Sequence, residues 1–576
     1  KLIKPQGKMA KTHLPLMNAL EIWESVSTQF ENVLTAYHGA CTLVDSCAVE
    51  RLFDAGDILF RLEREIDSLG NRLMQQFSGS RSHLTRARNK LATSVYHLPD
   101  EILANIFFKF INDFDPGKVQ SVEQGIRSTY RRLYTLICVC ADWRKLGLSH
   151  GAFWSLIPVP YNQSSYNMAK LSLERASGAG LYLAGTIYHA DSTLLDFMAK
   201  HQPRFCAVNL SGKNSRPLCE IVASLLKHSV PGHLTGLSIQ YQPHDSDPWS
   251  PHPPMHCYAE ELFSPSSYED AQIKEFVGSL LTLRLGGFKL DWRNMRFSRL
   301  VELRIQEVQL DDISMAENIL LAAASSPTLR SLEFISVTID DRPLRLPRPD
   351  WNSRFTVSLS HLQSLRLQDL YKGLLRFILW SILPGSYKVI LTYTIYDCIS
   401  RDSPIDASLD PVELPSLNIH TLILANVYAD LLHFFLKSMP TLKRFYIRTY
   451  PELYGFRKIL QALVRPIGTK PDDDNANFAK LNVLYISGTS IDIFGSDLAI
   501  FKDAITSHDI QELGMGGPLN SYALDGSNSL TNDPNDDDNT ASVKEWLRDT
   551  VPKVRYMETW EEFPELAFRR ASWQLW

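Results

Sequence analysis

A short apolar pattern recurs along most of this chain. Each copy spans six residues, of which the first, fourth and sixth are apolar. The first copy is Phe205, Val208 and Leu210, and a weak last copy is Val551, Val554 and Tyr556. The alternation at the end of each copy predicts a half-buried strand. Copies begin at residues 205, 234, 280, 300, 329, 362, 419, 442, 481, 510 and 551, and residues 388–396 read as one more strand.

Between these copies, apolar residues fall at steps of three and four, the spacing of one helix face. Such segments lie at residues 194–198, 218–226, 273–277, 313–324, 431–436 and 498–505. Ser542 and Glu545 have the spacing of a capping box and predict the start of another helix. Strands and helices that alternate in this way predict stacked units, each burying its apolar face against its neighbours. The alternative is a globular α/β domain with parallel strands.

Residues 1–90 predict a helical arm. Ile58, Leu62, Ile66, Leu69 and Leu73 form a narrow apolar stripe with charged residues on the other faces. This stripe predicts either a short coiled coil or a helix packed on the segment that follows. The basic, polar residues 79–90 read as a connector.

Residues 91–160 predict a second, short helical part. Pro99 is suited to the start of a helix, and Asp100 and Glu101 place negative charge in its first turn. Apolar residues then recur at helical spacing up to Phe110. We expect a second amphipathic helix over residues 132–146 and a surface loop over 112–130, which contains a Pro-Gly pair. Helices this short bury little surface alone, so an apolar face is left for a partner.

This stretch resembles an F-box, the helical module that docks a substrate receptor onto the Skp-type adaptor of a cullin–RING ubiquitin ligase. The matching pieces, in family order, are Leu98-Pro99-x-Glu101-Ile102-Leu103-x-x-Ile106-Phe107, Val139-Cys140-x-x-Trp143-Arg144 and Phe153-Trp154-Ser155. The polar segment 112–130 reads as an insertion relative to the family. The resemblance implies adaptor-facing and supporting apolar residues at Leu98, Pro99, Ile102, Leu103, Ile106, Phe107, Val139, Cys140, Trp143 and Trp154. An ordinary helical hairpin is the alternative.

The later copies resemble the leucine-rich repeats that commonly follow an F-box. Three intervals between copies are 29 residues, close to the length of such a repeat, and longer intervals hold insertions. The chain departs from the family where an Asn or Cys would form a side-chain ladder. Those positions carry Val308, Val337, Leu370, Val427 and Thr489. We therefore expect an irregular, degenerate solenoid.

The expected fold is α+β and multi-domain. It comprises a helical arm over 1–90, an all-α F-box over 91–160, and an α/β solenoid resembling leucine-rich repeats over 161–576. With 576 residues, the chain is too long for one simple core.

A net charge of −5 argues against a nucleic-acid partner. Eight cysteines without regular spacing predict reduced thiols and a cytoplasmic or nuclear protein. No apolar run is long enough to predict a membrane span. Because the first residue is not Met, we expect the sequence to begin inside a longer one.

Motifs for chemistry are missing from the sequence, which predicts no enzyme activity and no cofactor. It contains no phosphate-binding loop, no GxSxG elbow and no HExxH. His252, His256 and Cys257 cluster with His244 nearby, but no second pair completes a zinc site, so we expect no metal. Asp533, Asn535 and Asp537 resemble the start of a calcium loop, which lacks the required Gly and Glu. Four insertions are expected to form loops, the last one disordered, at residues 240–265, 340–354, 470–477 and 516–540.

These features favour a non-catalytic substrate receptor. By resemblance, the F-box binds a Skp-type adaptor and thereby cullin, and the solenoid binds an unknown protein target for ubiquitin transfer. The alternative is a repeat scaffold that serves assembly without ubiquitination.

Overall fold

The computed structural model divides the chain into two compact units, Lys1–Leu98 and Pro99–Trp576. No helix in the part of the chain that it describes is long and apolar enough to cross a membrane. The structure describes residues 13–47, 55–92, 95, 98–113, 121–189, 192–228, 231–241, 259–263, 270–339, 355–370, 372–393, 418–425, 429–448, 456–466, 478–487, 496–516 and 535–557.

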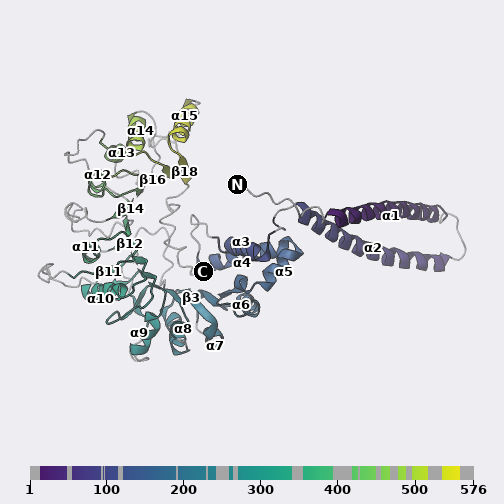
Figure 1. Ribbon diagram of the computed structural model, residues 1–576, viewed down its shortest axis with the longest axis horizontal. Helices are drawn as coiled ribbons and strands as arrows, with labels where there is room; N and C mark the ends of the chain where they lie inside the picture. Colours follow the sequence, from purple (N-terminus) through teal and green to yellow (C-terminus); the bar gives the residue numbers. More distant parts are fainter. Residues whose placement is uncertain are drawn as a thin grey trace. The chain divides into compact units, whose positions relative to one another are not determined.

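The first unit contains two long helices, α1 (His13–Cys47) and α2 (Ala55–Ala92), which lie side by side (Figure 1). The rings of Phe30 and Phe77 meet edge to face, with centroids 5.3 Å apart. The end of α1 and the start of α2 lie at the same end of the pair, so the two helices run antiparallel as a hairpin (Figure 1). The helical character expected for this part of the chain is confirmed over residues 13–47 and 55–92, and the bounds of the arm stay a prediction. The connector expected over 79–90 is wrong, because these residues continue α2 to Ala92.

The second unit begins with three helices and a short 3₁₀ turn: α3 (Asp100–Ile111), α4 (Val122–Val139), α5 (Ala141–Ser149) and η2 (Gly151–Trp154). The loop expected over 112–130 is partly wrong, because Ser121 and Gln124 form a capping box that starts α4. The single helix expected over 132–146 is also wrong. Cys140 is extended (φ −156°, ψ 173°) and ends α4, and its sulfur accepts from the Trp143 N–H to start α5.

A parallel sheet fills the rest of the unit, with 14 strands in the described residues and each strand pairing with the next along the chain. Its strands are β1 (Leu156–Pro158), β2 (Leu181–Ile187), β3 (Phe205–Gly212), β4 (Gly236–Tyr241), β6 (Thr282–Gly286), β8 (Glu302–Gln306), β10 (Ser331–Ile335), β12 (Ser364–Gln368), β13 (Lys388–Tyr393), β14 (Ile419–Ala425), β15 (Arg444–Arg448), β16 (Val483–Ser487), β17 (Glu512–Gly516) and β18 (Lys553–Met557). Four two-residue strands pair separately: β5 (Glu260–Glu261) with β7 (Phe288–Lys289), and β9 (Gln309–Leu310) with β11 (Thr338–Ile339).

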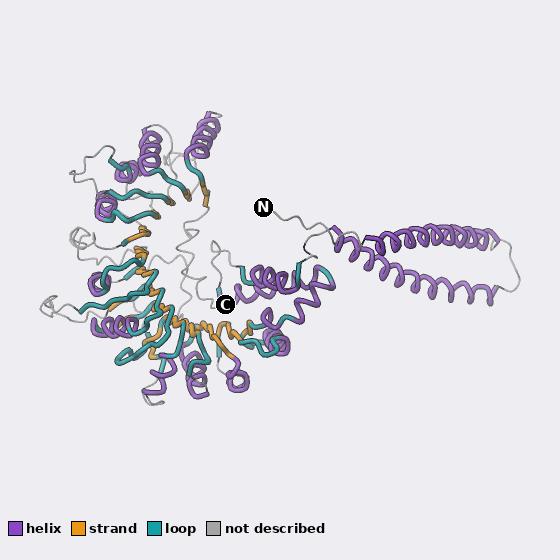
Figure 2. Tube along the Cα trace, in the orientation of Figure 1, coloured by secondary structure: helices purple, strands orange, loops and turns teal. Residues whose placement is uncertain are grey.

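Helices connect many of the strands and lie on one side of the sheet (Figure 2). They are α6 (Gln163–Arg175), α7 (Ser192–His201), α8 (Ser215–His228), α9 (Asp270–Gly278), α10 (Ile313–Ala324), α11 (Lys372–Ser381), α12 (Ala429–Ser438), α13 (Phe456–Leu463), α14 (Ser496–His508) and α15 (Asn535–Thr550), with the 3₁₀ turn η3 (Gln202–Arg204). Strands pair about 4.8 Å apart whereas packed helices need about 8–10 Å. One-sided helices therefore favour a sheet that curves away from them.

One apolar core joins the strands to these helices. In the apolar copies before the last one, the second and third residues, such as Leu303 and Ile305, point toward the helices and are buried with helix residues such as Leu320. In the last copy, Tyr556 is 54% exposed. The parallel register places Leu303 beside Leu332, and Leu332 beside Leu365. Phe107 and Trp154 belong to the same core, so the helices α3–α5 and the sheet pack as one hydrophobic cluster. The domain boundary at 160 stays a prediction.

The strands predicted from the apolar copies are confirmed, and so is the extra strand at β13. Helices α7–α10, α12 and α14 are also confirmed. The all-α character expected for residues 91–160 is wrong, because Leu156–Pro158 form the first strand of the sheet. Helix α15 begins at Asn535 rather than at the capping box of Ser542, so residues 535–540, expected to be disordered, are helical.

Main-chain hydrogen bonds take the place of the side-chain ladder that the sequence lacks. Directly after β8 and β10, Glu307 and Ser336 adopt left-handed backbone angles, with φ of 53° and 51°. The Glu307 N–H donates to the Ile335 carbonyl (2.9 Å), and the Ser336 N–H donates to the Gln368 carbonyl (2.8 Å). The buried turn backbone is therefore satisfied by the neighbouring strand. The next residues, Val308, Val337 and the equivalent Leu370, pack in the core; Val427 and Thr489 lie outside the described residues.

Candidate binding surfaces

Helix α3 carries two apolar faces, and only one of them is covered. Leu103, Phe107 and Ile111 repeat at steps of four and are buried in the core. Ile102 and Ile106 are each 47% exposed, and Phe110, one further turn along, is 43% exposed. An amphipathic helix needs only one apolar face to pack on its own core. The second, exposed face is a candidate for contact with a partner.

The predicted site residues therefore separate into exposed and internal groups. Pro99 is the exposed N-cap of α3, with φ −55°, and Leu98, the residue before it, is half-buried. Val139 is 56% exposed at the end of α4, and Cys140 is half-buried at the break between α4 and α5. Leu103, Phe107 and Trp154 are buried and support the fold.

Trp143 and Trp154 hold the short helices together from inside. The Trp143 ring meets the Phe107 ring edge to face, with centroids 4.6 Å apart, and is half-buried. The Trp154 indole N–H donates to the Gly147 carbonyl at 2.8 Å. These contacts fix α5 against α3 and η2, and they explain which face of α3 turns inward.

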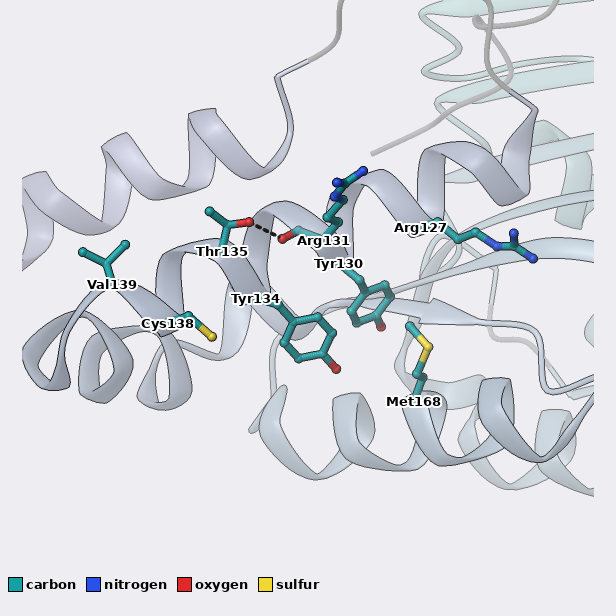
Figure 3. A pocket seen from close by; sticks show the side chains of 8 residues that line it. All are labelled: Arg127, Tyr130, Arg131, Tyr134, Thr135, Cys138, Val139 and Met168. Atoms are coloured by element: carbon teal, nitrogen blue, oxygen red, sulfur yellow. Dashed lines mark hydrogen bonds between the residues drawn. The ribbon is translucent and has the colours of Figure 1, made fainter.

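A shallow hollow of about 710 Å³ lies beside α4 and is lined by residues of α4 and by Met168 of α6 (Figure 3). Tyr134 and Met168 point into the space between α4 and α6, while Thr135 donates to the Arg131 carbonyl at 2.8 Å. The lining combines apolar and aromatic surface with two arginines. The lining residues are Arg127, Tyr130, Arg131, Tyr134, Thr135, Cys138, Val139 and Met168.

Tyr130 anchors α4 to the sheet at the floor of this hollow. Its hydroxyl donates to the Leu156 carbonyl (2.5 Å) and lies 2.7 Å from the Ser172 hydroxyl. Burial raises the pKa of Tyr130 well above its ordinary value, so the phenol stays protonated. The hollow therefore has a rigid floor that joins α4, β1 and α6.

The other candidate surface is the face of the sheet opposite the helices, called here the strand-only face. Strand residues alternate between the two faces, so Arg284, Arg304 and Glu333 point away from Leu303 and its row. The parallel register places these three residues side by side on β6, β8 and β10. Arg284 binds both carboxylate oxygens of Glu302, at 2.7 and 3.0 Å.

Arg304 is the most enclosed charge of this row. Its side chain is 1% exposed and its Nε lies 3.4 Å from a carboxylate oxygen of Glu333. Burial lowers the pKa of Arg304 to about 10, and the charge of Glu333 opposes that shift. Arg304 therefore keeps its positive charge near neutral pH.

Toward the last strands, the strand-only face becomes aromatic. Tyr446 and Tyr485 lie on neighbouring strands with ring centroids 4.9 Å apart. Both tyrosines are 1% exposed, and they form a small buried cluster with Ile423, Val483 and Met557, separate from the main core.

Glu512 receives a ring of donors beside this cluster. The Tyr485 hydroxyl donates to it at 2.6 Å, and Lys553 and Arg555 lie 3.0 and 3.2 Å away. Burial would raise the pKa of Glu512, but the Tyr485 and Lys553 hydrogen bonds and the nearby positive charges lower it below its ordinary value. Lys553 and Arg555, whose side chains are each 48% exposed, are the accessible charges beside this cluster.

Metal-binding clusters do not occur among the residues that the structure describes. His244, His252, His256 and Cys257 lie outside the described residues, as does Asp533. Most of the four predicted insertions also lie outside them, including all of 340–354 and 470–477.

Sequence reasoning missed several residues of these surfaces. Phe110 was recognised only as one more apolar residue of the helix, although it follows Ile106 at a step of four. Arg127 was missed because the start of α4 was not recognised, and the Ser121–Gln124 capping box was the available signal. Tyr134 and Cys138 lie in the helix predicted over 132–146, but no local pattern places them beside Met168 of α6. The sequence also contains a signal for Arg284, Arg304 and Glu333. Each of them lies between the second and third apolar residues of its copy and must therefore point to the opposite face of the strand.

Comparison with known proteins adds no relationship: no protein-family model and no curated protein matches the chain.

Proposed function

We propose that this protein is the substrate-recognition subunit of an SCF-type cullin–RING ubiquitin ligase. The exposed face of α3 docks on a Skp-type adaptor, and the strand-only face with its loops holds a protein target. The observation that carries the proposal is the second apolar face of α3, Ile102, Ile106 and Phe110, which its own core leaves uncovered. It lies in the stretch that resembles an F-box.

The contribution to ubiquitin transfer is proximity rather than chemistry. A receptor that holds its target beside the charged conjugating enzyme raises the effective concentration of target lysines. A rigid link between the two surfaces serves this role. Tyr130, Phe107 and Trp154 provide such a link, because they pack the docking helices into the same core as the sheet.

The target surface combines fixed charges of both signs. Arg284 and Glu302, whose side chains are 12% and 22% exposed, present an ion pair near the middle of the sheet. Further along, Lys553 and Arg555 add positive charge with side chains that are each 48% exposed. Such a surface suits a folded or extended protein segment that carries charges of both signs.

Adaptor affinity tests the docking proposal. We expect the full chain to bind a purified Skp-type adaptor in titration calorimetry, and the Ile102→Ala, Ile106→Ala variant to bind about thirtyfold more weakly. This follows because anchors at an interface centre cost about 2 kcal/mol or more when truncated. The melting temperature should barely change, since both side chains are about half exposed.

A matched control changes two equally exposed apolar residues elsewhere. Leu321 and Leu383 are 52% and 45% exposed in the sheet region, and the Leu321→Ala, Leu383→Ala variant should keep full adaptor affinity. Trp143→Ala should lower both stability and affinity, because its ring packs on Phe107. Unchanged affinity in the Ile102, Ile106 variant with an intact fold would falsify the docking role. Adaptor binding without cullin in the complex would instead favour a scaffold.

A further inference from the structure

The hairpin of α1 and α2 exposes an unusual amount of apolar surface. Among its residues whose side chains the structure describes, none is buried; Leu69 and Leu73 are half-buried. Its exposed large apolar side chains are Met17, Leu20, Ile22, Trp23, Val26, Phe30, Val33, Leu34, Tyr37, Leu43, Val44, Ile58, Leu59, Phe60, Leu62, Ile66, Met74, Phe77, Leu84 and Leu91. Two helices alone cannot enclose such a set.

These residues follow the spacing of helices that pack in bundles. On α1, Leu20, Trp23, Phe30, Leu34, Tyr37 and Val44 are separated by steps of three, four and seven. Further apolar residues point away from the partner helix: Ile22 and Val33 are 65% and 64% exposed, and Ile66 on α2 is 69% exposed. Each helix therefore has apolar surface beyond the seam that it shares with the other.

The charges of the two helices are complementary. Helix α1 contains four acidic residues and no Lys or Arg, a net charge of −4. Helix α2 contains seven basic and four acidic residues, a net charge of +3. In a square bundle of two hairpins, every acidic α1 can lie beside two basic α2 helices, with like-charged helices on the diagonals. A second copy of the same hairpin thus offers the charge pattern that this surface requires.

The available area is large enough for a stable dimer. A helix of this length extends over about 50 Å. If each exposed apolar side chain loses on the order of 50 Å² of accessible surface, the twenty together supply about 1,000 Å² per copy. Stable interfaces bury roughly 800 Å² per partner.

We propose that the occupant of this surface is a second copy of the chain, and that α1 and α2 of two copies form an antiparallel four-helix bundle. The bundle buries the apolar residues that a single hairpin leaves in water, and it places two copies of the second unit in one assembly. This inference does not depend on the proposed function, because it uses only the first unit.

Sedimentation equilibrium of the full chain tests the proposal. We expect twice the mass of one chain at micromolar concentration. The Ile22→Lys, Ile66→Glu variant should dimerise at least about a hundredfold more weakly. Each substitution places a charge in the apolar interface between the two copies. The lysine at position 22 would lie beside the basic α2, and the glutamate at position 66 beside the acidic α1. Helix content measured by circular dichroism should be unchanged, since both positions are exposed within one copy.

The matched control places the same charges at exposed polar positions of the same helices. Asn32→Lys with Gln75→Glu should leave the dimer intact. A parent that stays monomeric at tens of micromolar, a mass of three or more copies, or a dimer that tolerates the Ile22, Ile66 changes would each overturn the proposal. Adaptor affinity of the dissociated variant should equal that of the parent, so this test and the docking test fail separately.

Discussion

Replacing Leu303 with Asp tests the apolar row on which the sheet depends. Leu303 is fully buried on β8, between Leu283 on β6 and Leu332 on β10. Losing the transfer free energy of the leucine costs about 2 kcal/mol. Near pH 7 the buried carboxyl must also take up a proton, and three pH units above an ordinary Asp pKa this costs about 4 kcal/mol. The total, about 6 kcal/mol, approaches the stability of a typical domain.

The pH dependence separates charge from shape. Leu303→Asn introduces a side chain of the same size as Asp that does not titrate. The free energy of unfolding that this variant loses should therefore not change with pH. We expect the difference between the Asp and Asn variants to grow by about 3 kcal/mol between pH 5 and pH 7. Urea unfolding followed by circular dichroism gives these free energies, each compared with the parent at the same pH.

Hydrogen exchange locates the effect along the sheet. Each strand pairs only with its neighbours in the sheet, so protection should fall most in β6, β8 and β10 and least in β16 and β17. If the Asp variant unfolds at the urea midpoint of the parent, or if the Asp–Asn difference is constant with pH, Leu303 does not lie in an enclosed core and the reasoning fails.

Two further predictions concern single buried groups. Burial lowers the pKa of His508 to about 4, and its Nε2 lies 2.6 Å from the Leu463 carbonyl. The unfolded chain therefore takes up the proton at a higher pH than the folded chain does. The free energy of unfolding should be at its full value above about pH 6.5 and fall by up to about 3 kcal/mol as the pH drops toward 4. His508→Gln should remove that component of the pH dependence of urea unfolding, and an unchanged pH profile would contradict the assignment. A Cβ added at Gly514 would lie 2.0 Å from the Tyr485 ring, whose hydroxyl bonds Glu512, so Gly514→Ala should cost about 1–3 kcal/mol of unfolding free energy. The same substitution in a Tyr485→Ala background should cost much less, and equal costs in both backgrounds would refute the steric explanation.

Much of the sheet could be predicted from the sequence because burial on one face repeats along the chain. Leu303 and Ile305 sit two residues apart in their strand, and the same spacing returns at Leu332 and Phe334. Each strand pairs with the next one in the chain, so the order of strands follows the order of the copies. Local periodicity is sufficient where neighbours in sequence are also neighbours in space.

The start of the sheet could not be predicted in this way. Leu156 and Ile157 form an apolar pair too short to show a period, and they were read as the end of a helical part. They become a strand because β2 pairs with them and because Tyr130 bonds the Leu156 carbonyl from α4. These partners come from segments that the local pattern cannot connect.

The candidate surfaces depended even more on tertiary structure. Both faces of α3 are apolar, so periodicity alone cannot tell Ile106, which is exposed, from Phe107, which is buried. The choice is made by Trp143, whose position depends on the break in the helix at Cys140. Likewise, Arg304 and Glu333 are 29 residues apart in sequence and meet only because β8 and β10 pair in register. The sequence by itself determined which residues avoid water; the packing of distant segments decided which of them remained uncovered, because a side chain is buried only where another part of the chain reaches it.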